Sequence, residues 1–126
     1  MPTAKIITSP VCNVTCFEQE KVAAIKAALA QEEPLLPQLA ELYKLLGNVA
    51  RLKILLSLAH GELCVCDVAH VLGLTVAATS HQLKLLRSQG WLTVRNDGKM
   101  VYYRVHSENL LRALKGDLRL LEERMA

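Results

Sequence analysis

The sequence predicts a mainly α-helical fold that carries one β-hairpin. Apolar residues recur at intervals of three and four in several segments, which is typical of helices with one buried face. Residues 91–106 instead alternate apolar and polar side chains around Asn96-Asp97-Gly98, which indicates a hairpin with a tight turn. The chain has 126 residues, 52% of them apolar, so it can form one domain with one core.

The N-terminal part divides into a tail and a first helix. Residues 1–16 contain two prolines and two cysteines without a clear period, so we predict a mobile, cysteine-containing tail. We place the folded domain at residues 17–126. Residues 17–33 are rich in helix formers and carry an apolar stripe at helical spacing, made of Val22, Ile25 and Leu29.

Two further helices follow in the first half of the domain. Pro37 opens a second helix over residues 37–46, and Gly47 ends it. Asn48 can cap a third helix over residues 49–60. This third helix is apolar nearly all round, so we expect it to be buried at the centre of the domain.

Two short helices precede the hairpin, and a long one follows it. "ELCV", residues 62–65, is expected to be extended, and Asp67 can cap a fourth helix that Gly73 ends. Thr75 can cap a fifth helix over residues 76–89. The last helix, over residues 107–126, carries a second apolar stripe, made of Leu110, Leu114, Leu118 and Leu121.

The two short helices joined by "GLT" and followed at once by a hairpin predict a winged helix-turn-helix. In such a unit the second helix enters the major groove of double-stranded DNA, and basic side chains hold phosphates. We therefore predict that operator DNA is contacted by Thr79, Ser80, His81, Gln82, Lys84 and Arg87, and by Arg95 and Lys99 on the wing. The alternative is that the hairpin packs on the core and the basic residues form a solvated face.

The apolar stripes of the first and last helices exceed what one small domain needs. We predict that they pair two chains into a homodimer, because helix-turn-helix proteins usually bind DNA as dimers. The alternative is that both stripes cover the core of their own chain.

Four cysteines form two close pairs, Cys12 with Cys16 and Cys64 with Cys66. Residues two apart share a side in a strand but not in a helix. Cys64 and Cys66 can therefore converge on one ion only if "LCVC" is extended or caps the helix start. With the tail pair they offer up to four thiolates, which suit soft or borderline metals such as Cd(II), Pb(II) and Zn(II).

Other interpretations of the thiols stay open. Cys64 and Cys66 are also suited to a small apolar role in the core, and a zinc ion with a purely structural role is a further alternative. A redox-responsive DNA-binding repressor, in which Cys64 and Cys66 form a disulfide or react with an oxidant, is another alternative. It is the weaker one, because thiol oxidoreductases use Cys-x-x-Cys at a helix start in a βαβ context. The sequence contains no phosphate-binding loop, no Gly-x-Ser-x-Gly and no His-Glu-x-x-His, so we predict neither an enzyme nor an organic cofactor.

Several stretches together resemble the ArsR/SmtB family of metal-sensing repressors. They are "LGNVARLKIL", "ELCVCDVAHVLGLTVAATSHQLKLLRSQG" and "VRNDGKMVYYRV", and the resemblance extends from about Cys12 to Glu123. The tail "CNVTCFEQEKV" is similar to the tail of the cadmium/lead sensors of the CadC type, which carry Cys-x-x-x-Cys before the first helix.

This resemblance implies a homodimer in which the tail of one chain meets Cys64 and Cys66 of the other, with Cys12 and Cys16 completing the thiolate shell. It implies release of DNA when Cd(II) or Pb(II) binds, with Zn(II) as a further candidate. An arsenite or antimonite sensor would need only three of the thiols. Many relatives have a second, C-terminal zinc site, and here its positions hold Ser107, Asn109, Leu120 and Glu123, so we predict that this site has been lost.

The sequence also predicts the compartment. No apolar run is long enough to cross a bilayer, and the N-terminal stretch lacks the apolar core of a signal peptide. We therefore expect a cytoplasmic protein without a membrane partner, whose thiols stay reduced.

Overall fold

The computed structural model describes the backbone of residues 6–9 and 12–125 and the side chains of residues 16–125. The chain forms two compact units, one ending at Leu42 and the other beginning at Tyr43. Each unit is described by itself.

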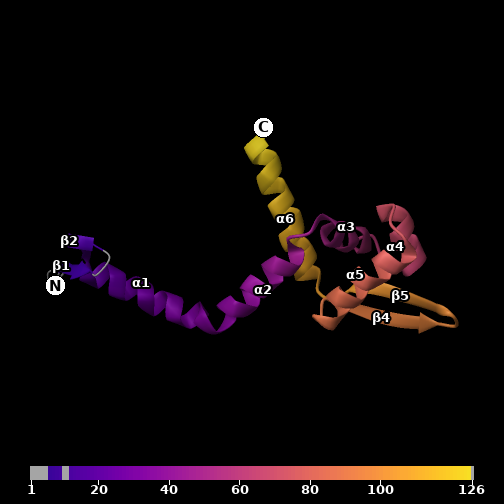
Figure 1. Cartoon of the computed structure of the whole chain (residues 1–126), viewed down its shortest axis with the longest axis horizontal. Coiled ribbons are helices and arrows are strands. Elements are labelled where there is room, and N and C mark those ends of the chain that lie inside the picture. The colour runs from indigo at the N-terminus through magenta and orange to yellow at the C-terminus, as the bar shows by residue number, and fades with distance from the viewer. Residues whose placement is uncertain (1–5, 10–11, 126) are drawn as a thin grey trace. The chain divides into compact units, whose positions relative to one another are not determined.

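The first unit contains a hairpin and a long helix (Figure 1). Strands β1 (Ile6–Ser9) and β2 (Cys12–Glu18) pair antiparallel, with two irregularities in their register. Helix α1 (Gln19–Glu32) and the 3-10 turn η1 (Glu33–Leu35) lead into α2 (Leu36–Leu46). We predicted a tail without regular structure here and did not foresee these strands, because the segment shows no clear alternation. No residue of α1 is buried, and the boundary between the units falls within α2 rather than at residue 17.

The second unit holds the predicted helices and hairpin. Its three-stranded antiparallel sheet has the strand order β3-β5-β4. After the end of α2, its elements are α3 (Val49–Leu58), β3 (Leu63–Cys64), α4 (Val65–Leu72), α5 (Val76–Ser88), β4 (Leu92–Asp97), β5 (Met100–Val105) and α6 (Glu108–Met125).

Local hydrogen bonds explain where most of these helices begin. The Asn48 side chain accepts from the backbone N–H of Arg51 at 3.1 Å, and the Thr75 hydroxyl accepts from that of Ala78 at 3.1 Å. Both predicted caps are therefore confirmed. The predicted cap of α4 is wrong: Cys64 is the N-cap, and Asp67 lies three positions later, where its carboxylate accepts from the Cys64 N–H at 3.3 Å.

The core of the second unit lies between α3, α4, α5 and the wing sheet. Its fully buried large side chains are Ile54, Leu55, Val68, Thr79, Leu83 and Leu86. Burying one aliphatic side chain of this size contributes about 1.5–3 kcal/mol. Helix α3 is less central than predicted, because Val49 and Lys53 on it are exposed.

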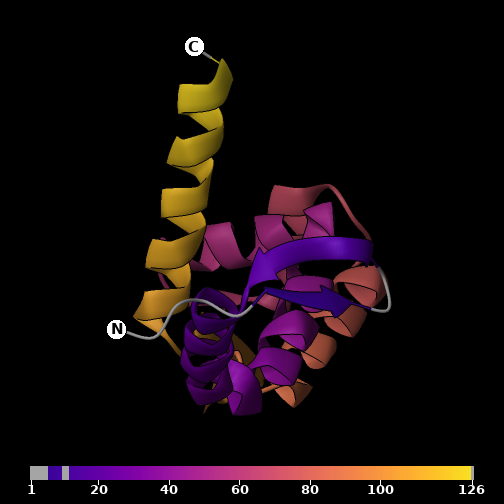
Figure 2. The same cartoon turned by 90° about the vertical axis from the view of Figure 1, so that its left-hand side faces the viewer.

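The wing has a two-residue turn. Asp97 pairs with Met100, which leaves Gly98 and Lys99 at the tip. Gly98 has a φ of 62°, the positive value that tight hairpin turns require of their first central residue. Figures 1 and 2 show the opposite end of this unit, where the C-terminal half of α6 extends beyond α3, α4 and α5.

Candidate nucleic-acid interface and thiol site

Helix α5 is anchored on one face and open on the other. Thr79, Leu83 and Leu86 are buried without measurable exposure, and they hold the helix against the core. His81, Lys84 and Arg87 are exposed, and neither cation forms an ion pair with any residue that the structure describes. Three of the predicted DNA-contacting residues are therefore on an accessible surface.

Thr79 does not belong to that surface. Its side chain is fully buried, and its hydroxyl donates to the backbone carbonyl of Thr75 at 2.8 Å. The prediction that Thr79 contacts DNA is contradicted by this burial, because its polar atom is already used inside the helix. Sequence spacing could not distinguish it from its neighbours.

Ser80 and Gln82 are half-buried at the edges of α5. The Gln82 side-chain carbonyl accepts from Arg51 Nη1 at 3.2 Å, and Arg51 Nε also donates to the carbonyl of Leu45. Arg51 thereby connects the end of α2, α3 and α5. The Gln82 carbonyl thus helps to position α5, and the contact of this side chain with a base stays a prediction.

The first turn of α5 adds residues that we did not predict. Val76 and Ala77 are exposed at the N-terminal end of the helix, where a recognition helix meets base edges. Small apolar side chains at this position can contact the methyl group of thymine. Their place directly after the Thr75 cap was a usable signal, but apolar residues suggested core instead.

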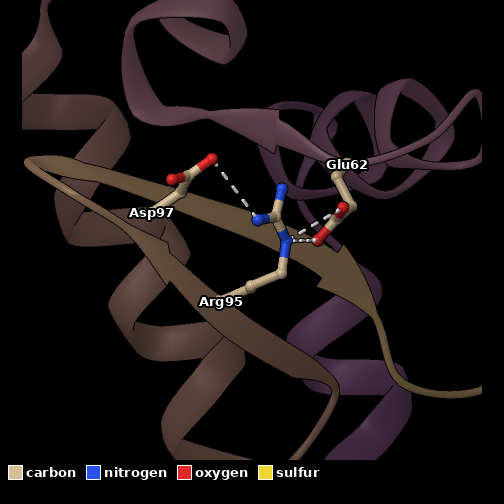
Figure 3. A network of polar contacts seen from close by, with 3 residues as sticks. All are labelled: Glu62, Arg95 and Asp97. Atoms are coloured by element: carbon tan, nitrogen blue, oxygen red, sulfur yellow. Dashed lines mark hydrogen bonds and ion pairs between the residues drawn. The ribbon is translucent and has the colours of Figure 1, made fainter.

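The predicted wing residues differ from each other. Lys99 is exposed at the tip, whereas Arg95 takes part in a polar network (Figure 3). Arg95 Nε donates to both Glu62 carboxylate oxygens, at 3.1 and 3.3 Å, and Arg95 Nη1 lies 3.7 Å from Asp97 Oδ2. The Arg95 guanidinium also stacks over the Tyr102 ring, 4.8 Å from its centre.

This network has an electrostatic consequence. Glu62 raises the pKa of the Arg95 guanidinium above its usual value, first through the hydrogen bond and then through its charge. The Arg95 guanidinium is paired with the Glu62 and Asp97 carboxylates in this structure, and its contact with a phosphate stays a prediction. It ties the wing to the segment just before Cys64.

The two central thiols have different surroundings. Cys64 is 5% exposed and sits at the end of β3, whereas Cys66 is exposed in the first turn of α4; neither is in a disulfide. The backbone condition we set is met, since Cys64 is extended and caps the helix. The single chain nonetheless places one thiol in the core and the other at the surface.

The tail thiols complete this description only in part. Cys16 is exposed near the end of β2, and the side chain of Cys12 lies outside the residues whose side chains are described. Among the described residues, no group of three His, Cys, Asp or Glu side chains is placed to hold a metal ion. Ligation by all four cysteines stays a prediction.

The predicted dimer stripes are divided by burial. Leu110 and Leu114 are buried, so in this half of α6 the alternative of a chain covering its own core is correct. The rest of both stripes is exposed or half-buried: Val22, Ile25 and Leu29 on α1, and Leu118 and Leu121 on α6. Within the second unit, Leu118 and Leu121 border an open apolar hollow together with Tyr43, Leu46, Leu52 and Leu56.

The positions of the C-terminal zinc site carry little metal-binding chemistry. Ser107 accepts from the backbone N–H of Leu110 at 3.4 Å, and Asn109, Leu120 and Glu123 are exposed. Only Glu123 offers a carboxylate.

A model of a bacterial regulatory protein family, the arsR family, matches residues 48–93 of this chain, from the α3 cap to the start of β4. The chain is also 35% identical over 121 residues to the cadmium resistance transcriptional regulatory protein CadC of Listeria innocua, which covers 95% of this chain and 100% of that protein. The chain belongs to the ArsR family. This ArsR-family protein is a DNA-binding transcriptional regulator and not an enzyme, as predicted.

Solved structures of similar proteins confirm the winged helix-turn-helix fold. A homodimeric winged helix-turn-helix DNA-binding domain from Mycobacterium bovis is 33% identical, with a TM-score of 0.68, and covers 75% of this chain and 88% of that one. The antimony-specific transcriptional repressor AntR is 35% identical, with a TM-score of 0.65, and covers 71% of this chain and 82% of that one. No helix that the ArsR-family structure describes is both long and apolar enough to span a membrane.

Proposed function

We propose that this ArsR-family chain is a metal-responsive transcriptional repressor that binds operator DNA as a homodimer and releases it when thiolates bind Cd(II) or Pb(II). One observation carries this proposal. Cys64 and Cys66 flank Val65, the first residue of α4, so a ligand that engages both thiols acts at the start of the helix-turn-helix unit. The likeness to a cadmium resistance regulator supports this choice of metal.

We assign the metal ligands to Cys64 and Cys66, completed by Cys12 and Cys16 of the partner chain. Thiolates prefer soft and borderline ions, so Zn(II) is a further candidate effector. Each thiol must lose its proton to bind, so affinity should rise with pH.

On DNA, α5 would lie in the major groove. His81 and the exposed first turn would meet base edges, while Lys84 and Arg87 would neutralise phosphates. Lys99 at the wing tip would contact a neighbouring part of the backbone. Buried Thr79 and the engaged Gln82 oxygen would hold α5 in place instead.

Dimerisation would bury the apolar residues that the single chain leaves exposed. These are Ile25 and Leu29 on α1 and Leu118 and Leu121 on α6. Exposed apolar side chains gathered on two helices are expected at an obligate interface rather than on a monomer surface.

Coupling between metal binding and DNA release would arise from the unequal burial of Cys64 and Cys66. Cys64 is buried and Cys66 is exposed, and we propose that binding one ion through both thiols rearranges the start of α4. A ligand shifts an equilibrium only by its differential affinity for the two states, and such couplings are typically about 1–3 kcal/mol. We propose that this rearrangement disfavours the DNA-bound placement of α5.

A second candidate is a repressor that responds to arsenite or antimonite. It would need three thiols rather than four, and the likeness to the antimony-specific repressor AntR favours it. Release of DNA by arsenite with Cys12 replaced by Ser would support this candidate.

The test is a titration of the reduced protein with Cd(II), Pb(II), Zn(II) and As(III). Thiolate-to-metal absorption in the ultraviolet reports binding, and anisotropy of a labelled operator duplex, recovered by selection with the purified protein, reports release. We expect Cd(II) and Pb(II) to release DNA from the native chain but not from Cys66→Ser. Retained release from Cys66→Ser would show that the thiol trigger is wrong.

A further inference from the structure

The Arg95–Glu62 ion pair joins parts of the chain that lie far apart in sequence. Its partners are 33 positions apart, whereas the Arg95–Asp97 pair lies within the wing and Arg112–Glu108 lies within α6. Glu62 stands two residues before Cys64, and Arg95 stands on β4 near the wing tip. The pair therefore spans from the thiol segment to the wing.

The sheet provides a second connection between the same two places. Tyr102 on β5 pairs with Cys64 on one side and with Arg95 on the other, so the three residues form one row across β3, β5 and β4. The Arg95 guanidinium covers the Tyr102 ring of that row at 4.8 Å. Cross-strand neighbours are the units through which a sheet transmits packing.

We infer that Glu62 and Arg95 are positioning residues that pass the state of Cys64 to the DNA-contacting wing. This inference rests on the proposed function, because it takes Cys64 to be a metal ligand. A displacement of β3 moves the Glu62 carboxylate, and Arg95 then carries the wing with it. Without the contact, only the pairing of β3 with β5 still links the thiol segment to the wing, so a shift of β3 reaches the wing tip less completely.

The strength of the contact suits this role. The Arg95 side chain is 53% exposed and that of Glu62 is 35% exposed, so water and salt screen the pair. Exposed ion pairs contribute little to folding stability. Removing this one should therefore leave the fold intact and alter the response to metal.

Glu62→Gln and Asp97→Asn make a matched pair of variants. Each removes one negative charge beside Arg95, but only Glu62 lies outside the wing. The measured quantity is the ratio of operator affinities without and with Cd(II). We expect Glu62→Gln to lower this ratio by up to about fivefold, the upper limit for one exposed ion pair, and Asp97→Asn to leave it unchanged. Neither variant should weaken DNA binding without metal, because both keep every cation.

Arg95→Gln tests the other partner. It should lower the ratio as much as Glu62→Gln does, and the double variant should lower it no further, since both remove one contact. Arg104→Gln removes a cation from the same sheet that forms no ion pair with any described residue, and it should leave the ratio unchanged.

The outcomes separate this inference from the proposed function. If Cd(II) gives thiolate absorption and releases DNA equally from native protein, Glu62→Gln and Arg95→Gln, the positioning role is overturned and the sensor function stands. If the native protein neither shows the absorption nor releases DNA, the proposed function fails and this inference fails with it.

Discussion

The recognition helix and the wing carry the same kind of charge but are held in opposite ways. Helix α5 rests on three fully buried side chains, and its cations Lys84 and Arg87 point to solvent without ion-pair partners among the described residues. Residues 95–100 of the wing are all exposed, and Arg95 is held by carboxylates. A helix packed on the core with exposed cations suits DNA binding, whereas an exposed hairpin whose arginine is paired with Glu62 suits communication with the thiol segment.

The largest expected effect tests the anchoring of α5. Leu83→Ala removes a fully buried side chain and should lower the free energy of unfolding by about 2–5 kcal/mol. Met100→Ala on the exposed part of the wing should change it by no more than about 0.5 kcal/mol. Urea unfolding followed by circular dichroism measures both. Equal losses would contradict the contrast between the two elements.

The next effect concerns charge. Replacing both Lys84 and Arg87 with Gln should weaken operator binding about tenfold or more and reduce the slope of log affinity against log salt by about 4, since each of the two chains of the homodimer loses two phosphate contacts. Lys99→Gln at the wing tip should reduce the slope by about 2, one contact for each chain of the homodimer. Fluorescence anisotropy over a series of salt concentrations measures the slope. An unchanged slope in the double variant would show that Lys84 and Arg87 do not contact phosphates.

A contrast of the same kind separates the two central thiols. Cys64 is buried at the end of β3, and Cys66 is exposed on α4. In a Cys12→Ser/Cys16→Ser background, iodoacetamide should modify Cys66 about tenfold faster than Cys64, because access limits the buried thiol. Peptide mass spectrometry over a time course gives both rates, and equal rates would mean that the start of α4 opens freely.

The smallest expected effect concerns Thr79, which is buried against the core although the sequence predicted a DNA contact. Thr79→Val keeps the shape but removes the hydroxyl that donates to Thr75, which should cost about 1 kcal/mol of stability. Base preference, measured by selection from a randomised duplex, should stay the same. His81→Ala should change the base preference. A changed base preference in Thr79→Val would instead show that Thr79 contacts DNA.

Several features could be predicted because they depend on residues close together in the chain. The caps at Asn48 and Thr75 each use a side chain that bonds an N–H three positions later. The wing follows from alternation around a glycine turn. Asp67 failed as a cap although it has the right side chain, because β3 pairs with β5 up to Cys64 and the helix begins directly afterwards.

Other features could not be predicted, because spacing says which residues share a face but not what covers it. The stripe on α6 is regular, yet its first two leucines are buried and its last two are exposed, since the helix runs past the core that covers its start. Thr79 lies among the predicted DNA contacts in the sequence, but it is buried with Leu83 and Leu86 on the side of α5 that packs on the core.

The order of the elements, the place of the thiols before α4 and the family of the chain follow from the sequence alone, because they depend on local patterns and on similarity along the chain. The burial of Cys64 in the core, the exposure of Cys66 and the ion pair between Glu62 and Arg95 emerge only when the chain is folded. Those relations depend on how β3 joins the wing sheet, which brings together residues 33 to 40 positions apart that no local periodicity connects.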